Sequence, residues 1–572
     1  TPKPAYYYDN EKDALVFSSQ AVDKVFNPFF STSGADSNVI GLTQLGMLSN
    51  DSKGNWTYGD DEAAVTKDLQ IVTEGEENVN QTTTYYFVLK NNVRFSNGSY
   101  LTIKDVLFNL YVYLDPVYTG SSTIYSTDIV GLKEYRTQEV DENEQDSFKD
   151  RFEVSARTRI NSLISASKEI LKDSNYDGDF ESSLLEYASP EGSKYSETYK
   201  NVVNDYKKAV ELFKEELESD YTSATDIPEE VKFKDKDGNE YSNLLSTQVE
   251  VFLLNEGYLK WVKKDGKLES SLVTDPAELK TWTKEQAINT IIMDKIPDKI
   301  VEIVSYWATS TELFNYIVNE EMGNYFNNNS NRKFNNISGI KFANHTEPVV
   351  VNGVTYDVPE YDADGNINKD SYEVLSIKIK NVDPKAIWNF SFGVAPMYYY
   401  SDEEHIKAFD FETNFGVEYA SGKFMNEVVK NPDRIGVPVG AGAYAASKSS
   451  GGIENIKSGD FYDLGIIYYE RNPYFVLGPA TIKKVRYKVV AENQMLNSLY
   501  SNEIDFIEPN AKPETITEIS NKIKKGEGLG FQSIRTSGYG YIGINASKVK
   551  DLEVRQAIMH SINTMECVNY YK

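Results

Sequence analysis

The apolar positions near the start of the chain alternate between the two-residue period of strands and the three-to-four-residue period of helices. Residues 83–90 are rich in β-branched and aromatic side chains, and 96–99 contain an Asn-Gly pair that tolerates positive φ, an order that predicts a hairpin. Thr102 and Asp105 then resemble a helix capping box with aspartate as the acid, and apolar residues follow at helical spacing until Pro116. The chain is therefore predicted to begin with a mixed α/β domain.

The pattern changes between about residues 139 and 344. Acidic and Asn/Ser-rich stretches separate amphipathic segments there, and strand signals become sparse. Within 198–221, apolar residues recur every three or four positions, which predicts a helix with one apolar stripe. Thr283 and Gln286 form a second capping box ahead of another apolar run. These features predict a helical insertion packed on a host domain.

Strand patterns return in the last third of the chain. The segments predicted as strands are 349–351, 374–379, 484–489, 504–507 and 539–545. In 484–489, Val485, Tyr487 and Val489 face one way while the two basic residues between them face the other. Helices are predicted at 492–500 and after Asp551, and the sequence stops within the last helical pattern.

Charge and composition exclude several classes of function. A chain of 572 residues corresponds to two to four domains, at roughly 100–200 residues for each domain. The formal net charge of −28 repels phosphate backbones and anionic headgroups, so we expect neither nucleic-acid binding nor polybasic membrane docking. The single cysteine, Cys567, excludes an internal disulfide framework, and three histidines leave little material for a histidine-rich metal site.

The sequence gives no direct cellular address. It contains no run of about 18 apolar residues and no N-terminal signal-peptide pattern. A cytosolic chain and an exported chain whose leader has been removed would both look like this. The scarcity of cysteine leans towards export.

Common catalytic motifs are missing from the sequence. No G-x-S-x-G, H-E-x-x-H or P-loop lysine pattern occurs. Residues 440–444 read Gly-Ala-Gly-Ala-Tyr, but without a third glycine they predict a tight turn and not a phosphate loop. Paired-carboxylate chemistry needs only two acids, which cannot be located among 87. No catalytic residue and no cofactor are predicted.

Residues 360–373 contain oxygen-bearing side chains at alternate positions around a glycine, a pattern that suits calcium. The candidate ligands are Asp362, Asp364 and Asn366. Neither EF-hand register is complete, since one lacks the carboxylate at position twelve and the other lacks the glycine at position six. Flanking β-branched stretches favour a plain hairpin turn, and calcium is the weaker alternative.

Tyrosine is the unusual component, at 41 residues. Tyrosines cluster at 111–125, run consecutively at 398–400 and recur at Tyr539 and Tyr541. An aromatic ring with a polar tip suits a wet cleft that must hold varied ligands. A half-buried sheet surface would also account for any one of them.

Six short motifs occur in a characteristic order. They are Phe26–Asp36, Val93–Val106 with its continuation Tyr113–Tyr118, Val439–Tyr444, Glu470–Phe475, Asn502–Asp505 and Val554–Ile558. In this order they resemble the family 5 extracellular solute-binding proteins, the peptide and nickel receptors of ABC importers. The resemblance covers about residues 13–135 and 370–570, and the helical insertion lies outside it.

The resemblance implies an α/β fold like that of periplasmic binding proteins, with two lobes of mixed sheets (type II, cluster C) and a large helical insertion. Residues 1–45 would start lobe I, 46–390 would form an extra subdomain that includes the insertion at about 139–344, and 391–503 would complete the lobe I core. Residues 504–572 would start lobe II. The family pattern continues beyond this point, so we expect lobe II to be incomplete in this chain.

The resemblance also implies ligand-binding positions. In the family, main-chain groups hold the backbone of a bound peptide, and roomy hydrated pockets accept varied side chains. The positions implied here are Ser31, Thr32, Ser33, Gly34, Asp36, Tyr118, Tyr125, Glu508, Asn510 and Tyr539. The implied function is a monomeric receptor that captures oligopeptides in a cleft and delivers them to an ABC importer permease. Such a receptor is periplasmic or at the cell surface, where it would touch the membrane only through a lost lipid anchor.

Three alternatives stay open at this point. Within the family, the ligand could be an oligosaccharide or a nickel chelate, with nickel the weaker because it favours imidazole ligands. A secreted glycosidase would turn over a chromogenic glycoside and lose that activity when one Asp or Glu is substituted. A surface scaffold would capture a partner through residues 140–344 and keep doing so after deletion of the cleft loops.

Overall fold

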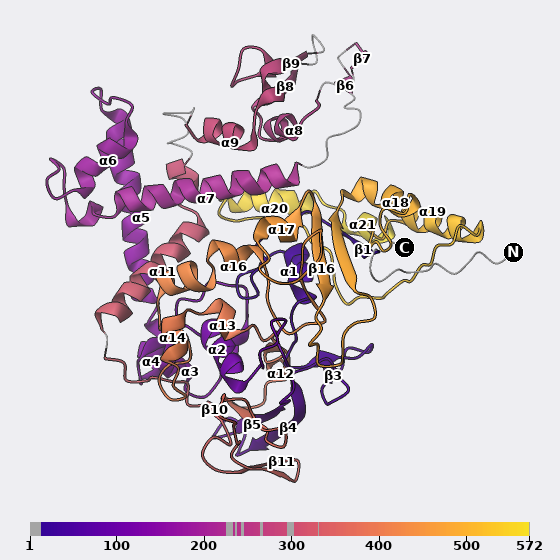
Figure 1. Cartoon of the computed structure of the whole chain (residues 1–572). Helices are drawn as coiled ribbons and strands as arrows, with labels where there is room; N and C mark the ends of the chain where they lie inside the picture. Colours follow the sequence, from indigo (N-terminus) through magenta and orange to yellow (C-terminus); the bar gives the residue numbers. More distant parts are fainter. Residues whose placement is uncertain are drawn as a thin grey trace. The chain divides into compact units, whose positions relative to one another are not determined.

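The computed structural model describes residues 13–224, 233–234, 237–241, 245–262, 267–293, 303–329 and 331–570 (Figure 1). Packing divides the chain into two compact units. Unit 1 comprises Thr1–Val154 and Val318–Val490, and unit 2 comprises Ser155–Ile317 and Ala491–Lys572. The lobe boundaries given above stay a prediction. The predicted class, α/β with mixed sheets and a large helical insertion, is confirmed.

The first sheet of unit 1 joins the two ends of that unit. Its path is β1 (Leu15–Ser19), β17 (Lys484–Val489), β16 (Ile466–Arg471) and β14 (Tyr444–Ala446), with β15 (Tyr462–Asp463) also paired to β16. Strand β1 runs parallel to β17 with Leu15 opposite Val485, and the other pairings are antiparallel. Val485, Tyr487 and Val489 pack against the same hydrophobic core, as their alternation predicts.

The second sheet of unit 1 is antiparallel. Its strands follow the order β10 (Ile340–Phe342), β13 (Val374–Lys380), β5 (Thr82–Leu89) and β4 (Thr66–Glu74). The ladder partners of β5 are thus β4 and β13. The predicted turn at 96–99 forms, but the hairpin around it is small, with a single bridge between Arg94 and Tyr100.

Helix α2 (Ile103–Tyr113) is the buried helix of unit 1. The predicted capping box is present, because the Thr102 hydroxyl accepts a hydrogen bond from the amide of Lys104 and the Asp105 carboxylate accepts one from the amide of Thr102. Nearly every residue of the helix is buried. The Asn109 side chain donates to the carbonyl of Ala395 at 2.8 Å and so fixes the helix to a segment far along the chain.

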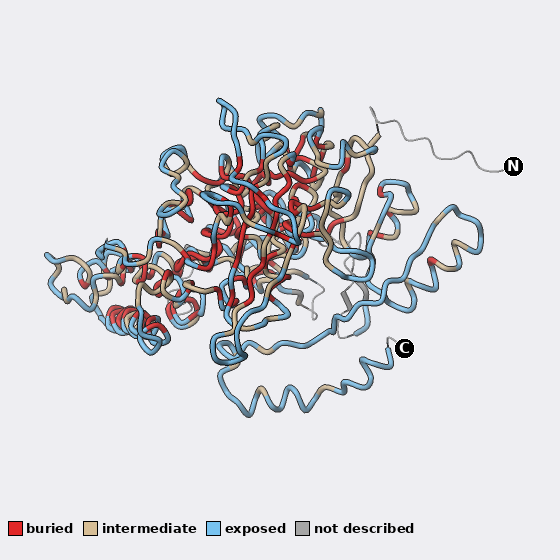
Figure 2. The backbone as a smooth tube through the Cα atoms, turned by 90° about the horizontal axis from the view of Figure 1, so that it is seen from below, coloured by how far each residue is buried: buried red, intermediate tan, exposed pale blue. Residues whose placement is uncertain are grey.

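Short elements complete unit 1. They are α1 (Gly34–Gly41), β2 (Ser49–Asn50), β3 (Trp56–Thr57), α3 (Leu132–Thr137), α4 (Glu142–Ser147), β11 (Val349–Val351), β12 (Val354–Tyr356), α12 (Ala386–Asn389), α13 (Met397–Tyr400), α14 (Glu403–Lys407), α15 (Gly422–Phe424), α16 (Pro432–Gly436) and α17 (Ser458–Phe461). In Figure 2 the buried tube runs through the centre of this unit, with exposed loops around it.

The predicted helical insertion is confirmed. Its helices are α5 (Asp150–Lys172), α6 (Phe180–Ala188), α7 (Val202–Ser223), α8 (Gln248–Asn255), α9 (Lys284–Met293) and α11 (Thr311–Asn328). Short strand pairs that the sequence did not predict are β6 (Phe233–Lys234) with β7 (Glu240–Tyr241) and β8 (Leu259–Val262) with β9 (Lys267–Ser270). Helices α5 and α7 are joined by a buried ion pair in which Arg159 donates to both oxygens of Asp205. A pair that satisfies both partners in this way specifies how the helices pack.

The C-terminal part of unit 2 contains the helices α18 (Glu492–Tyr500), α19 (Pro513–Lys524), α20 (Leu552–His560) and α21 (Thr564–Tyr570). Neither segment predicted as a strand at 504–507 or 539–545 forms a strand, although Phe506 in the first takes part in an isolated bridge. Residues 539–545 form no ladder within the described chain, and Tyr539 and Tyr541 are 86% and 80% exposed. A strand needs a neighbour to accept its backbone hydrogen bonds, and residues 539–545 have none among the described residues. Among the described helices, none is both long enough and apolar enough to cross a bilayer.

The segment 440–444 is a close-packed turn and not a ligand loop. The amide of Gly442 donates to the carbonyl of Thr43 at 2.9 Å. A Cβ atom on Gly442 would lie 2.6 Å from the carbonyl oxygen of Leu42 and 2.5 Å from the carbonyl carbon of Thr43. Glycine is required here because two stretches of backbone approach each other closely.

We therefore expect Gly442→Ala to lower the free energy of unfolding by about 1–3 kcal/mol, the usual cost of overpacking. Urea titration followed by circular dichroism measures this value. Gly459→Ala is the matched control, because a Cβ at Gly459 meets no atom within 4 Å. Equal stability of the two variants would contradict the close approach.

Candidate functional site

The structure brings together two of the loops that the family resemblance implies for ligand binding. Loop 27–34 lies against the segment that follows Pro116. The Tyr118 hydroxyl donates to the carbonyl of Phe29, and the Ser121 hydroxyl donates to the carbonyl of Ser31 at 3.0 Å. Asn27, fully buried, donates to the carbonyl of Val429 at 2.8 Å and anchors the start of the first loop.

Asp36, one of the predicted ligand residues, is buried and engaged by the backbone. Its two carboxylate oxygens accept hydrogen bonds from the amides of Asp23 and Val25, both at 2.9 Å. Burial raises the pKa of this carboxyl despite those bonds. Asp36 therefore fixes the backbone of residues 23–25. Nearer to solvent are the half-buried Ser31 and Ser33 and the exposed Thr32 and Gly34.

The two predicted tyrosines of unit 1 differ in accessibility. Tyr118 is buried, with its ring packed 5.5 Å from that of Phe30 and its hydroxyl committed to Phe29. Tyr125 is 43% exposed, and the Arg136 guanidinium lies 5.1 Å from the centre of its ring. Of the two, Tyr125 is therefore the one whose face can meet a ligand.

The other predicted positions belong to unit 2. Glu508, Asn510 and Tyr539 are exposed. The amide of Asn510 donates to the Glu492 carboxylate at 2.8 Å, which ties this segment to the start of α18. As ligand residues, all three stay a prediction.

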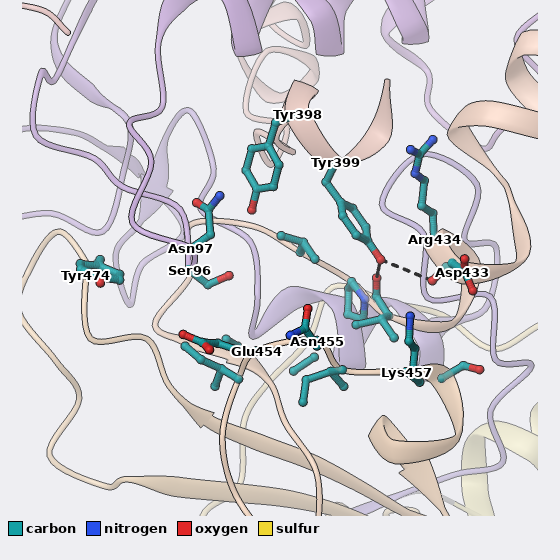
Figure 3. A pocket seen from close by; sticks show the side chains of 18 of the residues that line it. Ser96, Asn97, Tyr398, Tyr399, Asp433, Arg434, Glu454, Asn455, Lys457 and Tyr474 are labelled. Carbon is teal, nitrogen blue, oxygen red and sulfur yellow. Dashed lines mark hydrogen bonds between the residues drawn. The ribbon is translucent and has the colours of Figure 1, made fainter. Parts of the chain in front are cut away.

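Unit 1 also contains a polar cavity of about 800 Å³ that the sequence did not predict as a site (Figure 3). Its walls come from the turn 96–97, from α13 and from the segments 431–439 and 453–458. Figure 3 shows the hydroxyl of Tyr398 pointing towards Ser96 and Asn97. The run of tyrosines at 398–400 supplies lining residues of this cavity, and so do three of the family motifs, those at 93–106, 439–444 and 470–475.

The charged side chains around this cavity balance one another. Arg434 and Lys457 supply two positive charges, and Asp433 and Glu454 supply two negative ones. The Arg434 guanidinium donates to the carbonyl of Ser401 at 3.1 Å, so part of its hydrogen-bonding capacity is used within the fold. The arrangement can bind polar or zwitterionic groups through hydrogen bonds.

Asp105 positions the tyrosine-bearing helix of this cavity. One of its oxygens accepts a hydrogen bond from the amide of Met397 at 2.9 Å, at the start of α13, while the other caps α2. The Tyr399 hydroxyl then donates to the carbonyl of Val437 at 3.0 Å. Burial raises the pKa of Asp105 to about 7, because desolvation penalises the charged carboxylate more than its hydrogen bonds favour it.

The calcium candidate at 360–373 adopts the alternative conformation, a turn. One Asp362 oxygen accepts the amides of Asp364 and Asn366, both at 2.9 Å, and Gly365 takes a φ of 81°. A bridge between Tyr361 and Ile367 flanks the turn. Over the described residues, no group of three or more His, Cys, Asp or Glu side chains is placed to hold a metal.

Part of the chain matches a known protein family. Residues 373–571 match the family described as Bacterial extracellular solute-binding proteins, family 5 Middle, which is the family that the motifs resemble. The type of protein in this family is a solute-binding receptor and not an enzyme. No curated protein gave a match.

Several solved structures are similar to the chain. Lactococcal OppA, complexed with an endogenous peptide in the closed conformation, is 11% identical with a TM-score of 0.36, covering 90% of this chain and 47% of that one. NikZ from Campylobacter jejuni, in complex with Ni(L-His), is 11% identical with a TM-score of 0.36 and coverages of 97% and 55%. AppA from Bacillus subtilis, in complex with a nonapeptide, is 12% identical with a TM-score of 0.32 and coverages of 90% and 46%. The chain spans about half the length of these proteins.

The buried Asp105 predicts a pH effect on stability. Its folded pKa lies above its unfolded value, so the stability that its neutral form contributes is complete at low pH and is lost as the pH rises through about 7. Asp105→Asn removes this titration. We expect the variant to gain on the wild type by up to about 1.4 kcal/mol per pH unit between pH 4 and 7. Urea titrations across this range test this, and parallel profiles would contradict it.

The turn at 360–373 predicts that calcium does not stabilise the protein, because the Asp362 oxygen nearest the turn is already engaged by two amides. We expect the same melting temperature in calcium and in chelator. An upward shift in calcium that Asp362→Asn abolishes would instead establish the calcium site.

Proposed function

We propose that this chain is part of the substrate-binding receptor of an ABC importer, that it captures oligopeptides, and that it performs no catalysis itself. The match of residues 373–571 to the family carries this proposal. The meeting of loops 27–34 and 116–126 supports it, since the family resemblance implies ligand contacts on both. A receptor of this kind works outside the cytoplasm and passes its ligand to a permease.

In this proposal, unit 1 supplies one wall of the ligand site. The accessible groups on its two loops are small hydroxyls, a glycine and the exposed ring of Tyr125. Small side chains leave the backbone within reach of a peptide main chain, and a tyrosine face accepts varied side chains. Residues 504–572 would begin the opposing lobe, with Glu508, Asn510 and Tyr539 as its contributions. We infer a monomer that touches the membrane only through a lipid anchor.

Titration calorimetry against defined peptide pools tests the ligand class. We expect the wild type to bind oligopeptides and Tyr125→Ala to bind them with several-fold lower affinity. The control Tyr58→Ala should bind with unchanged affinity, because Tyr58 is a half-buried tyrosine of unit 1 outside both loops. The loss expected for Tyr125→Ala reflects removal of the one exposed aromatic face on the proposed wall. Binding only to an oligosaccharide or to a nickel chelate would overturn the peptide proposal.

A further inference from the structure

A second cavity of unit 1, of about 540 Å³, lies beside Tyr125. Its walls come from the segment 125–128, from α3 and from the start of the inserted chain at 145–149. Three basic side chains, those of Lys133, Arg136 and Lys149, line it together with two acidic ones, Asp128 and Asp146. The lining therefore has an excess of one positive charge in a chain whose net charge is −28.

Arg136 is the unusual group in this cavity. Its Nε atom is buried and has no hydrogen-bond partner among the described residues. Among the described residues, its guanidinium forms no ion pair within 4 Å. It lies instead over the ring of Tyr125. A buried donor without an acceptor is costly, so its persistence calls for a ligand.

The buried acid near Arg136 is committed elsewhere. Asp115 is fully buried, and its two oxygens accept the amides of Val117 and Ala420, each at 2.9 Å. It attracts Arg136 only at longer range, and burial lowers the pKa of the Arg136 guanidinium. The N–H groups of the Arg136 guanidinium are therefore available to bind a ligand.

Lys149 adds a second cation to the same wall. Burial and the positive charge of Arg136 both lower the pKa of its ammonium, so the two charges lie near enough to repel each other. Lys149 pairs with no acid in the described chain, although Asp128 and Asp146 line the cavity. An anion placed between Arg136 and Lys149 would relieve this repulsion and give both cations an acceptor.

We propose that this cavity binds a carboxylate of the captured peptide, with Arg136 as the principal donor and Lys149 as the second cation. Guanidinium matches a carboxylate geometrically, through two parallel hydrogen bonds. The inference rests on the proposed function and narrows it, because it makes the receptor selective for acidic ligands. It also gives the inserted chain a role in recognition, since Lys149 lies at its start.

The carboxylate could be an acidic side chain or the C-terminus of the peptide. Four matched pentapeptide pools separate these sources: one position is Glu or Gln, and the C-terminus is free or amidated. Affinities are measured by calorimetry for the wild type, Arg136→Gln, Lys149→Gln and the control Lys369→Gln. Lys369 is an exposed lysine of unit 1 that lines none of the cavities described here.

We expect the wild type to bind one of the carboxylate-bearing pools about tenfold more tightly than its uncharged counterpart. A difference of this size corresponds to one hydrogen bond to a charged group. Arg136→Gln should abolish the preference, Lys149→Gln should reduce it, and Lys369→Gln should leave it intact. If Arg136→Gln does not fold, as judged by circular dichroism, the Lys149→Gln variant decides. Equal preferences in wild type and variants would overturn the inference while leaving the receptor proposal in place.

Glutarate, observed by saturation-transfer NMR, tests the cavity without any peptide. Binding to the wild type that Arg136→Gln or Lys149→Gln weakens, in the absence of peptide binding, would support the carboxylate site and count against the receptor proposal. No binding of glutarate and none of any acidic pool would overturn the inference.

Discussion

The parallel pairing of β1 with β17 is the interaction on which the rest of the structure depends. It joins residues 15–19 to 485–489. The first and last strands of unit 1 are therefore neighbours, although more than 460 residues separate them in the sequence. The strand Lys484–Val489 contributes apolar side chains to the core that it shares with Val22, Phe26 and Ile40. The chain returns to unit 2 directly after this pair, at Ala491.

This closure explains why a large helical block can be inserted into the unit. The block leaves after Val154 and returns at Val318. Each doubling of a closed loop costs only about 0.6 kcal/mol of extra entropy, so the host strands tolerate the added length. The inserted helices bring their own buried contacts, among them the ion pair of Arg159 with Asp205. The stretch just before the block, still within unit 1, adds a wall to the host, because Lys149 lines the same cavity as Arg136.

The sequence predicted those features that local chemistry determines. The capping box of Thr102, the apolar helix after it and the alternation in 484–489 depend on neighbouring residues, and all three are observed. The strand at 539–545 was predicted from composition and is wrong, because pairing depends on a partner that the pattern cannot reveal. The family resemblance implies ligand contacts on both loops, and the hydroxyls of Tyr118 and Ser121 join these loops to each other. Ligand binding there stays a prediction.

The candidate site itself could be predicted only in part. Asp36 was expected at a ligand, yet both of its oxygens face backbone amides, a role that residue type alone does not distinguish. Arg136 and Lys149 carried no signal, because α3 and the residues that follow α4 bring them to one cavity only in the folded chain. Tyr398 lines a cavity because Asp105, which is distant in the sequence, accepts a hydrogen bond from the start of α13. The sequence pattern does not reveal this contact.

The central claim is that the paired loops of unit 1 and the Arg136 cavity form one ligand wall. Hydrogen–deuterium exchange with and without an acidic peptide pool tests this most directly. The account predicts slower exchange of amides at 29–34 and 121–136 when the peptide is present, and a smaller effect in Arg136→Gln. Protection confined to other segments of the chain, with these two unchanged, would contradict it.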